Sequence, residues 1–462
     1  MPERHERLLN ALTQEYRQAY APSGAAHERA SRVLVDGISH GARTHNPFPL
    51  RIRAAQGAHI TEVGGRRLLD YWQGHYANIL GHNPPEVTQG LVAMLQAGYG
   101  LQTGLPEERE AEYAELLAQT TGADQVRLTT SGTLATMYAL MVARAYTGRK
   151  LVLKVGGGWH GANPLALKGV AHSDGGYDRI DSAGISSSAD QEILVTRFND
   201  VEALELVFAL YGDQIAAFIF EPCPSIAGFI PSSPAYMQAA RRLTAQHGAL
   251  LILDEVITGF RYCASGAQRL YGVQADLTTY GKIIGGGMPI AAVAGRADLM
   301  ALIREGASPR VWFNGGTYSA HPLSVLGALL MLRYLVAHED EVYPALAAQG
   351  ERLRQGIEEA MAAEGVLARC TGRGNAAVQG SSLSTVYFPL QEDLAPQGPE
   401  ALHDPRLCDL TLAEPVLKIG LLLQGVNVVH GLGALSMAHT EADLERTWAA
   451  FGALAQRIRA GA

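Results

Sequence analysis

The chain has 462 residues, 47% of them hydrophobic and 18% charged, and its formal net charge is -8 at pH 7. A chain of this length suits two or more packed lobes around a large buried core. The charges are spread without basic runs, which argues against a nucleic-acid-binding surface or a polybasic membrane-surface segment. We therefore expect small molecules and other protein subunits as partners.

The cysteines and the N-terminus indicate the compartment. Cys223, Cys263, Cys370 and Cys408 follow no paired metal-ligand spacing, and a disulfide framework is unusual in so large a chain. Residues 1–7 are mixed in charge, and no uninterrupted apolar stretch is long enough to span a membrane. These features predict a cytoplasmic protein without a metal site or a membrane anchor.

The N-terminal part, residues 1–75, is predicted as a helical arm followed by a small hairpin. Apolar residues recur at helical spacing over 3–34. Residues 52–72 then indicate a strand, a turn at Gly64 and Gly65, and a second strand. We place a domain boundary just after this hairpin.

The middle part, residues 76–335, alternates helical stretches with short, nearly all-apolar runs. Such runs are typical of strands buried on both faces of a mostly parallel sheet, and therefore of an α/β domain. The runs are LVLKV at 151–155, AAFIF at 216–220, ALLILD at 249–254 and IAAVAG at 290–295.

The C-terminal part, residues 336–462, is predicted as a smaller α+β domain. Its pattern indicates a charged helix over 341–365 and a last helix over 441–461. Strand-like segments lie between them at 385–388 and 427–430.

Asp254 and Glu255 directly follow the apolar run that starts at Ala249. In open α/β sheets, ligands bind beyond the carboxyl ends of the strands. A carboxylate at this place can pair with a protonated pyridine nitrogen, which is the electronic tuning that a pyridoxal phosphate enzyme requires. The alternative is a strand-end aspartate that caps a neighbouring loop.

Lys282 follows LTTY and precedes Ile283, Ile284 and three glycines. Apolar surroundings lower the pKa of an amine, and an amine that is partly neutral can attack an aldehyde and form an imine. The glycines would allow a cofactor to approach the backbone. The alternative is a solvated surface lysine.

Two further segments suit a phosphorylated, planar cofactor. Ser131, Gly132 and Thr133 stand at the start of a long predicted helix, where free N–H groups and two hydroxyls can hold a phosphate. Trp159 lies with His160 among glycines, where its ring could stack on a cofactor. The alternatives are a plain helix N-cap and a core tryptophan in a loop.

In chain order, six motifs together resemble the signatures of the class III, fold-type I aminotransferases, nearest the glutamate-1-semialdehyde aminomutase branch and the related β-amino-acid transaminases. They are SGT (131–133), GGWHG (157–161), EPCPSIAG (221–228), LLILDEVITGFR (250–261), TTYGKIIGGGMPIAAVAG (278–295) and GGTYSAHPLS (315–324). The resemblance runs from about Gly37 to the C-terminal AHTEADLERTWAAF. It implies a fold-type I pyridoxal phosphate transferase with a large domain built on a mostly parallel sheet and a small α+β domain.

The resemblance also implies a role for each matching residue. Lys282 would be the Schiff-base lysine, Asp254 the partner of the pyridine nitrogen, and Val256 and Trp159 the two side chains that cover the faces of the ring. Trp159 stands where the family usually has tyrosine. Ser131, Gly132 and Thr133 match the phosphate cup, and Thr317 matches a residue that reaches the phosphate from the neighbouring subunit. The resemblance therefore implies a homodimer with shared active sites.

On the substrate side, Arg43 falls where the aminomutase branch keeps an arginine for the substrate carboxylate, a role that suits a guanidinium. The alternative is a surface charge. His75 takes the place of an aromatic residue of that branch. His40, His45, Tyr76 and His430 are further pocket candidates, with a hydrogen-bonded place in the core as their alternative.

Several positions depart from the family pattern. Leu134 replaces an acidic residue after the phosphate cup, and Ile226 stands where an asparagine is expected. His75 and Gly431 change the substrate pocket and argue against glutamate-1-semialdehyde as the substrate. The segment 46–50, NPFPL, is similar to the β-amino-acid transaminases.

The sequence thus predicts an aminotransferase that moves an amino group between an amino acid and an oxo acid, with Lys282 as cofactor tether and base and pyridoxamine phosphate as the carrier. β-Amino acids and aromatic amino acids are the donor classes that we expect. One alternative keeps the fold and gives an aminomutase of the glutamate-1-semialdehyde type or an amino-acid racemase. Another is a non-catalytic protein that binds pyridoxal phosphate and serves in regulation or assembly.

Overall fold

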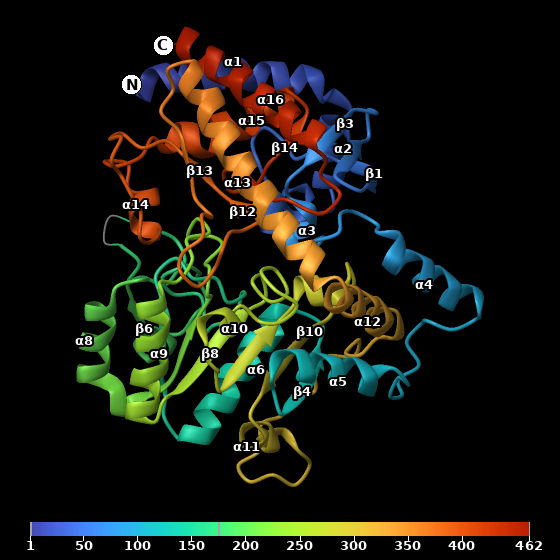
Figure 1. Ribbon diagram of the computed structural model, residues 1–462, viewed down its shortest axis with the longest axis vertical. Coiled ribbons are helices and arrows are strands. Elements are labelled where there is room, and N and C mark those ends of the chain that lie inside the picture. Colours follow the sequence, from blue (N-terminus) through green and yellow to red (C-terminus); the bar gives the residue numbers. More distant parts are fainter. Residues whose placement is uncertain (1, 174–175, 462) are drawn as a thin grey trace.

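A computed structural model describes residues 2–173 and 176–461 and consists of two lobes (Figure 1). In the larger lobe, the described residues form a seven-stranded sheet with the order β4-β10-β9-β8-β7-β5-β6. The bounds of these strands are β4 (Gln125–Thr129), β10 (Ala291–Gly295), β9 (Leu277–Tyr280), β8 (Leu250–Glu255), β7 (Ile215–Phe220), β5 (Leu151–Val155) and β6 (Ile193–Thr196). All four predicted apolar runs are strands of this sheet.

The sheet is parallel except at one strand. β9, β8, β7, β5 and β6 pair in parallel, whereas β10 runs antiparallel to both of its neighbours, β4 and β9. Every residue of β7 and β8 is buried, as expected for strands that are covered on both faces. The prediction of an α/β domain with a mostly parallel sheet is therefore confirmed.

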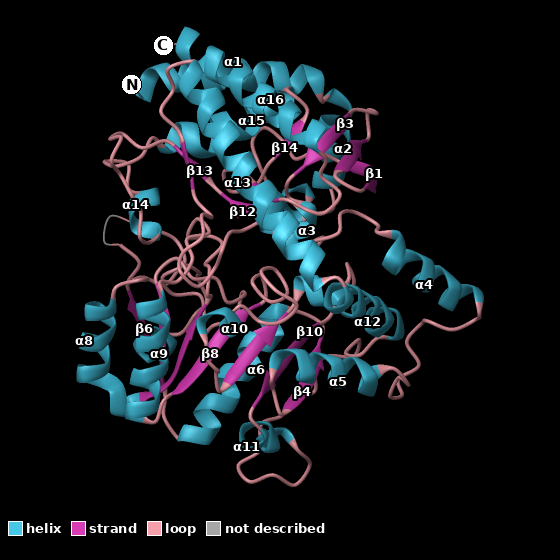
Figure 2. Ribbon diagram, viewed as in Figure 1, coloured by secondary structure: helices cyan, strands magenta, loops and turns pink. Residues whose placement is uncertain are grey.

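Helices cover the sheet (Figure 2). Helix α6 packs against β10, β9 and β7, and α9 packs against β8. The α-helices between the hairpin and residue 337 are α4 (Pro85–Gln96), α5 (Glu110–Thr121), α6 (Gly132–Thr147), α7 (Ser187–Glu192), α8 (Val201–Tyr211), α9 (Pro234–His247), α10 (Gln268–Tyr271), α11 (Ala297–Met300) and α12 (Pro322–Ala337). Shorter 3-10 helices are η3 (Gly212–Gln214), η4 (Lys282–Gly285) and η5 (Ala301–Ile303).

The smaller lobe combines the two ends of the chain, which lie side by side in Figure 1. Its sheet has the order β1-β2-β3-β14, and β14 pairs in parallel with β3 through Leu69 and Val426. The strands are β1 (Ile52–Gln56), β2 (His59–Glu62), β3 (Arg67–Asp70) and β14 (Val426–Asn427). The predicted turn at Gly64 and Gly65 lies between β2 and β3, but the first predicted strand folds back on itself as β1 and β2.

The remaining elements of the smaller lobe also come from both ends. Its helices are α1 (Pro2–Ala19), α2 (Ala21–Ser31), η1 (Val35–Gly37), η2 (Gly41–Arg43), α3 (Gln73–Tyr76), α13 (Glu339–Ala363), α14 (Pro399–His403), the π-helical η6 (Leu412–Val416), α15 (Leu417–Leu423) and α16 (Glu441–Ala460). Two short strand pairs are β11 (Arg369–Cys370) with β13 (Val386–Tyr387), and β12 (Leu383–Ser384) with β15 (Gly433–Ala434). The predicted N-terminal arm is thus two helices.

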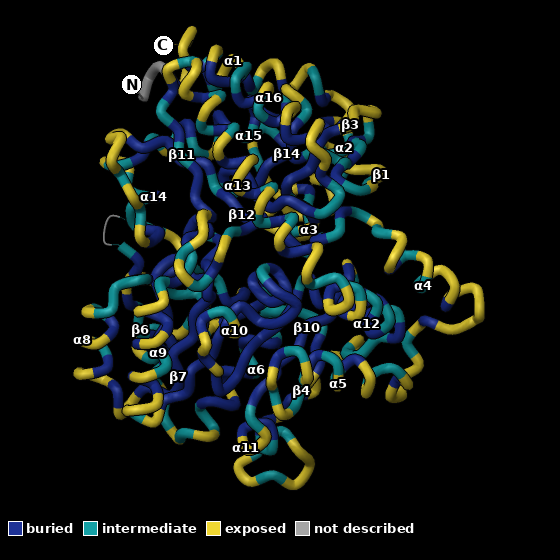
Figure 3. The backbone as a smooth tube through the Cα atoms, viewed as in Figure 1, coloured by how far each residue is buried: buried dark blue, intermediate teal, exposed yellow. Residues whose placement is uncertain are grey.

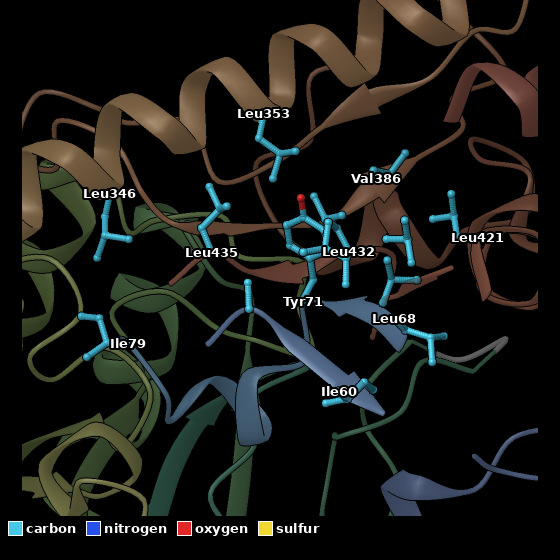
Figure 4. Close-up of a cluster of buried hydrophobic side chains, with 14 of the residues drawn as sticks. Ile60, Leu68, Tyr71, Ile79, Leu346, Leu353, Val386, Leu421, Leu432 and Leu435 are labelled. Atoms are coloured by element: carbon cyan, nitrogen blue, oxygen red, sulfur yellow. The ribbon is translucent and has the colours of Figure 1, made fainter. Parts of the chain in front are cut away.

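One apolar core joins these segments. In Figure 4, Tyr71 from the N-terminal part lies among Leu353, Leu432 and Leu435 from the C-terminal part. Figure 3 shows buried backbone through the large sheet and through the loops between the lobes, with exposed segments at the rim. The N-terminal segment shares both its sheet and its core with the C-terminal part. The predicted domain boundaries at residues 75 and 335 stay predictions.

No helix among the described residues is long and apolar enough to cross a membrane. Cys223, Cys263, Cys370 and Cys408 are all buried and unpaired. Over residues 2–173 and 176–461, His, Cys, Asp and Glu side chains form no group of three or more that could hold a metal ion.

Candidate active site

The predicted cofactor residues lie at one edge of the large sheet. Asp254 is near the end of β8, Lys282 follows β9 after a single glycine, and Ser131 lies just beyond β4 at the start of α6. Because β8 and β9 run in parallel, their carboxyl ends meet at the same edge. The fold therefore gathers residues that are far apart in the sequence.

Asp254 is buried, and hydrogen bonds hold both of its carboxylate oxygens. Nδ1 of His160 lies 2.8 Å from Oδ2 of Asp254, while Thr279 Oγ1 and the backbone N–H of Val256 donate to Oδ1 over 3.0 and 3.1 Å. Donors on both oxygens hold the carboxylate in one orientation. This is the arrangement that a partner of a protonated pyridine nitrogen needs.

His160 is almost completely buried, and burial is the main cause of its lowered pKa, which the Asp254 carboxylate partly opposes. A neutral ring that faces the carboxylate donates through Nδ1. Its Nε2 is buried and has no hydrogen-bond partner within the described part of the chain. The backbone oxygen of His160 accepts a hydrogen bond from Thr136 of α6 over 2.6 Å, which ties the Trp159 loop to the helix.

Lys282 is partly buried, and burial lowers the pKa of its amine. The nearby carboxylates of Asp254 and Glu221 act in the opposite direction and limit this effect. Its backbone φ is +50°, a left-handed conformation that is uncommon outside glycine and is often found at functional sites. The lysine is thus close to two carboxylates and carries an amine that loses its proton more readily than a free one.

Glu221 directly follows β7, so it occupies the same edge of the sheet as Asp254. Its carboxyl oxygens accept hydrogen bonds from the backbone N–H groups of Trp159 at 2.9 Å and Ser225 at 3.3 Å. Burial, with a further contribution from the Asp254 charge, raises its pKa to about 8. From the sequence, no role was predicted for Glu221, Thr279 or His160. For Glu221, its position directly after a buried strand was the signal that could have marked it as a residue of the site.

The predicted phosphate cup is the N-terminus of α6. Ser131 is its N-cap, and its Oγ accepts a hydrogen bond from the backbone N–H of Leu134 over 3.3 Å. A Cβ atom added to Gly132 would lie 2.9 Å from Cγ1 of Val256, and one added to Gly161 would lie 2.4 Å from Oγ1 of Thr133. The glycines therefore keep the cup, Val256 and the Trp159 loop in close contact.

These features fit pyridoxal phosphate. The first turn of α6 offers N–H groups to a phosphate, Asp254 offers an oriented carboxylate to a ring nitrogen, and Lys282 offers an amine to an aldehyde. Trp159 and Val256 come from loops that converge on the same edge of the sheet. Their contact with the two faces of the ring stays a prediction.

Thr317 is exposed in the loop before α12. Its backbone oxygen accepts a hydrogen bond from Gln102 Nε2 over 2.6 Å. A Cβ atom on the preceding Gly316 would lie 3.7 Å from Oγ1 of Thr130, which comes just before the phosphate cup. The predicted contact of Thr317 with a phosphate in the neighbouring subunit stays a prediction.

Arg43 and His75 line one pocket with a volume of about 560 Å³. Arg43 is exposed at the end of η2, and His75 lies in α3 with its ring 5.0 Å from that of His40. Burial lowers the pKa of His75 to about 3, and the charges of His40 and Lys282 add to this effect.

The other substrate-side candidates lie in different places. His45 also lines this pocket, whereas Tyr76 lies in a small cluster of buried residues beside Phe229. His430 lies beside Glu414 of η6, with its Nδ1 3.8 Å from Oε1 of that residue. Substrate contacts by Arg43, His75 and these residues stay predictions.

Known proteins resemble the chain over nearly its whole length. A glutamate-1-semialdehyde 2,1-aminomutase of Laribacter hongkongensis is 36% identical over 427 residues, which cover 91% of this chain and 96% of the relative. A transaminase solved with pyridoxal phosphate bound is 30% identical with a TM-score of 0.82, and covers 96% of this chain and 98% of its own. A β-phenylalanine aminotransferase of Variovorax paradoxus is 29% identical with a TM-score of 0.83, and 97% of each chain is covered.

The family model that matches the chain is that of the class-III aminotransferases, over residues 40–381. These findings confirm the fold-type I architecture and pyridoxal phosphate as the cofactor. The chain belongs to the class III aminotransferase family of pyridoxal-phosphate-dependent enzymes.

Proposed function

We propose that the enzyme moves an amino group between adjacent carbon atoms of one substrate, as an aminomutase of the glutamate-1-semialdehyde type does. The amine chemistry rests on the Lys282 amine, whose pKa is lowered, beside a carboxylate at Asp254 that is hydrogen-bonded through both oxygens. The names of the curated relatives, aminomutases that are 34–38% identical, favour this outcome over the transfer between two molecules predicted from the sequence.

Bound pyridoxal phosphate supplies an electron-withdrawing ring that stabilises negative charge on the substrate carbon. The N-terminus of α6 would hold the phosphate, and Asp254 would pair with the protonated ring nitrogen. His160 and Thr279 hold Asp254 in position, and Glu221 holds the Trp159 loop through its backbone. Lys282 Nζ would remove the proton from the substrate carbon that loses nitrogen and deliver a proton to the adjacent carbon that receives nitrogen.

A second candidate is transfer from an amino acid, with β-amino and aromatic donors in view, to a separate oxo acid. His75 replaces an aromatic residue of the aminomutase branch, and Gly431 replaces an acidic one. The transaminases among the solved structures, at 29–30% identity over nearly the whole chain, also support it.

The dimer, the compartment and the domain division belong to this proposal. Thr317 is exposed in a loop beside the segment that carries the phosphate cup, so it is available to a second subunit. Four unpaired cysteines agree with a reducing cytoplasm. We assign residues 76–335 to the cofactor-binding domain and 336–462 to the small domain, with 1–75 packed on the latter.

One stoichiometric assay separates the candidates. The holoenzyme is given glutamate-1-semialdehyde, then α-, β- and ω-amino acids singly, without any oxo acid, and cofactor absorbance and products are followed. Many turnovers to an isomeric amino ketone support the aminomutase. A single conversion per site that continues only after an oxo acid is added supports the aminotransferase. A bound cofactor that no amine converts would refute both and favour a non-catalytic role.

A further inference from the structure

The pocket that contains Arg43 and His75 is lined by residues of the smaller lobe and its adjoining loops, and we call it the distal pocket. Its volume is about 560 Å³, within the range of small-molecule sites. Much of its wall is aliphatic and comes from the segments around Ile38, Leu50 and Ile60. Lys418 and Asn427, from α15 and β14, close it from the C-terminal part of the chain.

The charges of the distal pocket are unbalanced. Among the residues described as lining it, three are cationic, Arg43, Arg51 and Lys418, and one is acidic, Asp70. The Asp70 oxygens already accept hydrogen bonds from the backbone N–H groups of Trp72 and Gln73 and from the side chains of His82 and Asn427. The pocket therefore has cationic side chains in excess and no free carboxylate to pair with them.

Its hydrogen-bond donors are also in excess. Nε of Arg51, Nε1 of Trp72 and Nε2 of His75 are buried and have no partner within residues 2–173 and 176–461. All three residues line the distal pocket. The arginine and tryptophan nitrogens can only donate. Buried donors without acceptors are rare in folded proteins, so an acceptor brought by a ligand explains them.

Lys418 lines the distal pocket beside Trp72. Its Nζ donates to Asn427 Oδ1 over 3.1 Å and to the backbone oxygen of Val428, which leaves one of its three protons for a ligand. Nζ lies 5.2 Å from the centre of the Trp72 ring. Burial lowers the pKa of Lys418 to about 8. An anion bound beside the amine would therefore stabilise the charged form, which burial disfavours.

One part of the distal pocket wall, the segment that carries His75, packs against the segment that carries Lys282. His75 belongs to α3, which packs against η4, the short helix that starts at Lys282. The Lys282 charge also contributes to the lowered pKa of His75, after burial and the His40 charge. The His75 ring lies 4.8 Å from that of Trp72, and Lys418 lies on the Trp72 ring, so contacts link the Lys282 segment with the distal pocket.

We propose that the distal pocket is a substrate subsite that receives a carboxylate at Lys418, carried on an apolar spacer that lies against the aliphatic wall. This inference rests on the proposed amine transfer and specifies its substrate class, an amine whose acid group stands at the far end of an apolar chain. Arg43 and Lys418 both line this pocket.

Pairs of n-alkylamines and ω-amino acids of equal chain length test the subsite, because the members of a pair differ only in the carboxylate. The readout is the concentration at which each amine converts half of the bound pyridoxal phosphate to the pyridoxamine form. We expect the acid to convert the cofactor at an about tenfold lower concentration once the chain reaches Lys418. Lys418→Met should abolish this preference, and Lys150→Met, an exposed control, should keep it. A preference that is the same in all three proteins would overturn the inference.

A binding measurement separates this inference from the proposed function. Calorimetry compares hexanoate with hexyl alcohol on the holoenzyme, because neither ligand carries an amine. Binding of hexanoate that Lys418→Met removes supports the subsite even if no amine is converted, a result that would refute the amine transfer alone. Equal weak binding of both ligands to wild type and variant would overturn the subsite while leaving any observed transfer intact.

Discussion

His160 Nδ1 lies 2.8 Å from Asp254 Oδ2, although 94 positions separate the two residues in the chain. His160 comes from the loop after β5, and Asp254 from the end of β8. The buried imidazole therefore fixes the Asp254 carboxylate, which makes His160 the positioning residue for the proposed contact with the cofactor ring.

We expect His160→Leu to weaken pyridoxal phosphate binding about tenfold or more, since a buried carboxylate oxygen loses a charge-assisted hydrogen bond. His160→Gln, which keeps an N–H donor at a similar place, should retain most of the affinity. Equilibrium titration of the apoprotein with the cofactor measures both. Equal losses in the two variants would show that ring shape, and not the hydrogen bond, supports Asp254.

The contact between Gly132 and Val256 predicts a pair of compensating substitutions. Gly132→Ala places a methyl group 2.9 Å from Cγ1 of Val256, so we expect the folded holoenzyme to lose about 1–3 kcal/mol. Val256→Ala in the same chain removes the clashing methyl groups and should recover much of this loss. Thermal unfolding with the cofactor bound measures the effect, and additive losses in the double variant would contradict the contact.

The lowered pKa of Lys418 predicts a pH-dependent stability. The pKa is about 8 in the folded protein and 10.5 for an ordinary lysine, so between these values the unfolded chain binds more protons. The free energy of unfolding of the wild type should therefore rise, relative to that of Lys418→Met, as pH increases from about 8 to 10.5, and the difference should be constant below pH 8. Urea denaturation across this range measures it, with Lys150→Met as the exposed control. Parallel curves for wild type and Lys418→Met would contradict burial of the amine.

Mixed dimers test the predicted role of Thr317. Thr317→Val should weaken cofactor binding in a homodimer, and Lys282→Ala should prevent attachment of the cofactor. If Thr317 serves the neighbouring subunit, a mixed dimer contains one site with both Lys282 and Thr317. Mixing the two variants should then restore activity at a cofactor concentration at which neither variant alone is active. No recovery, in a mixture shown by mass to form mixed dimers, would place Thr317 in the site of its own subunit.

Local patterns allowed much of the large domain to be predicted. The runs at 151–155, 216–220, 249–254 and 290–295 are strands because a continuous apolar run can be buried only between two covering layers. Ser131 and Gly132 mark the start of α6 for an equally local reason, since a hydroxyl satisfies a free N–H of the first turn. Lys282 and Asp254 stand out because a charged residue at or near the end of a buried strand needs a partner.

Tertiary structure alone decided which distant segments meet. The pairing of Leu69 with Val426 joins the two ends of the chain, and the distal pocket exists only because Lys418 comes to lie beside Trp72. His160 likewise gained its role from contact with Asp254. The amino-acid sequence by itself determined the buried strands of the large sheet and the start of α6, because the pattern of apolar and capping residues records local burial. It did not determine which surface covers each buried face, because many apolar segments can cover one another and only the packing of the whole chain selects among them.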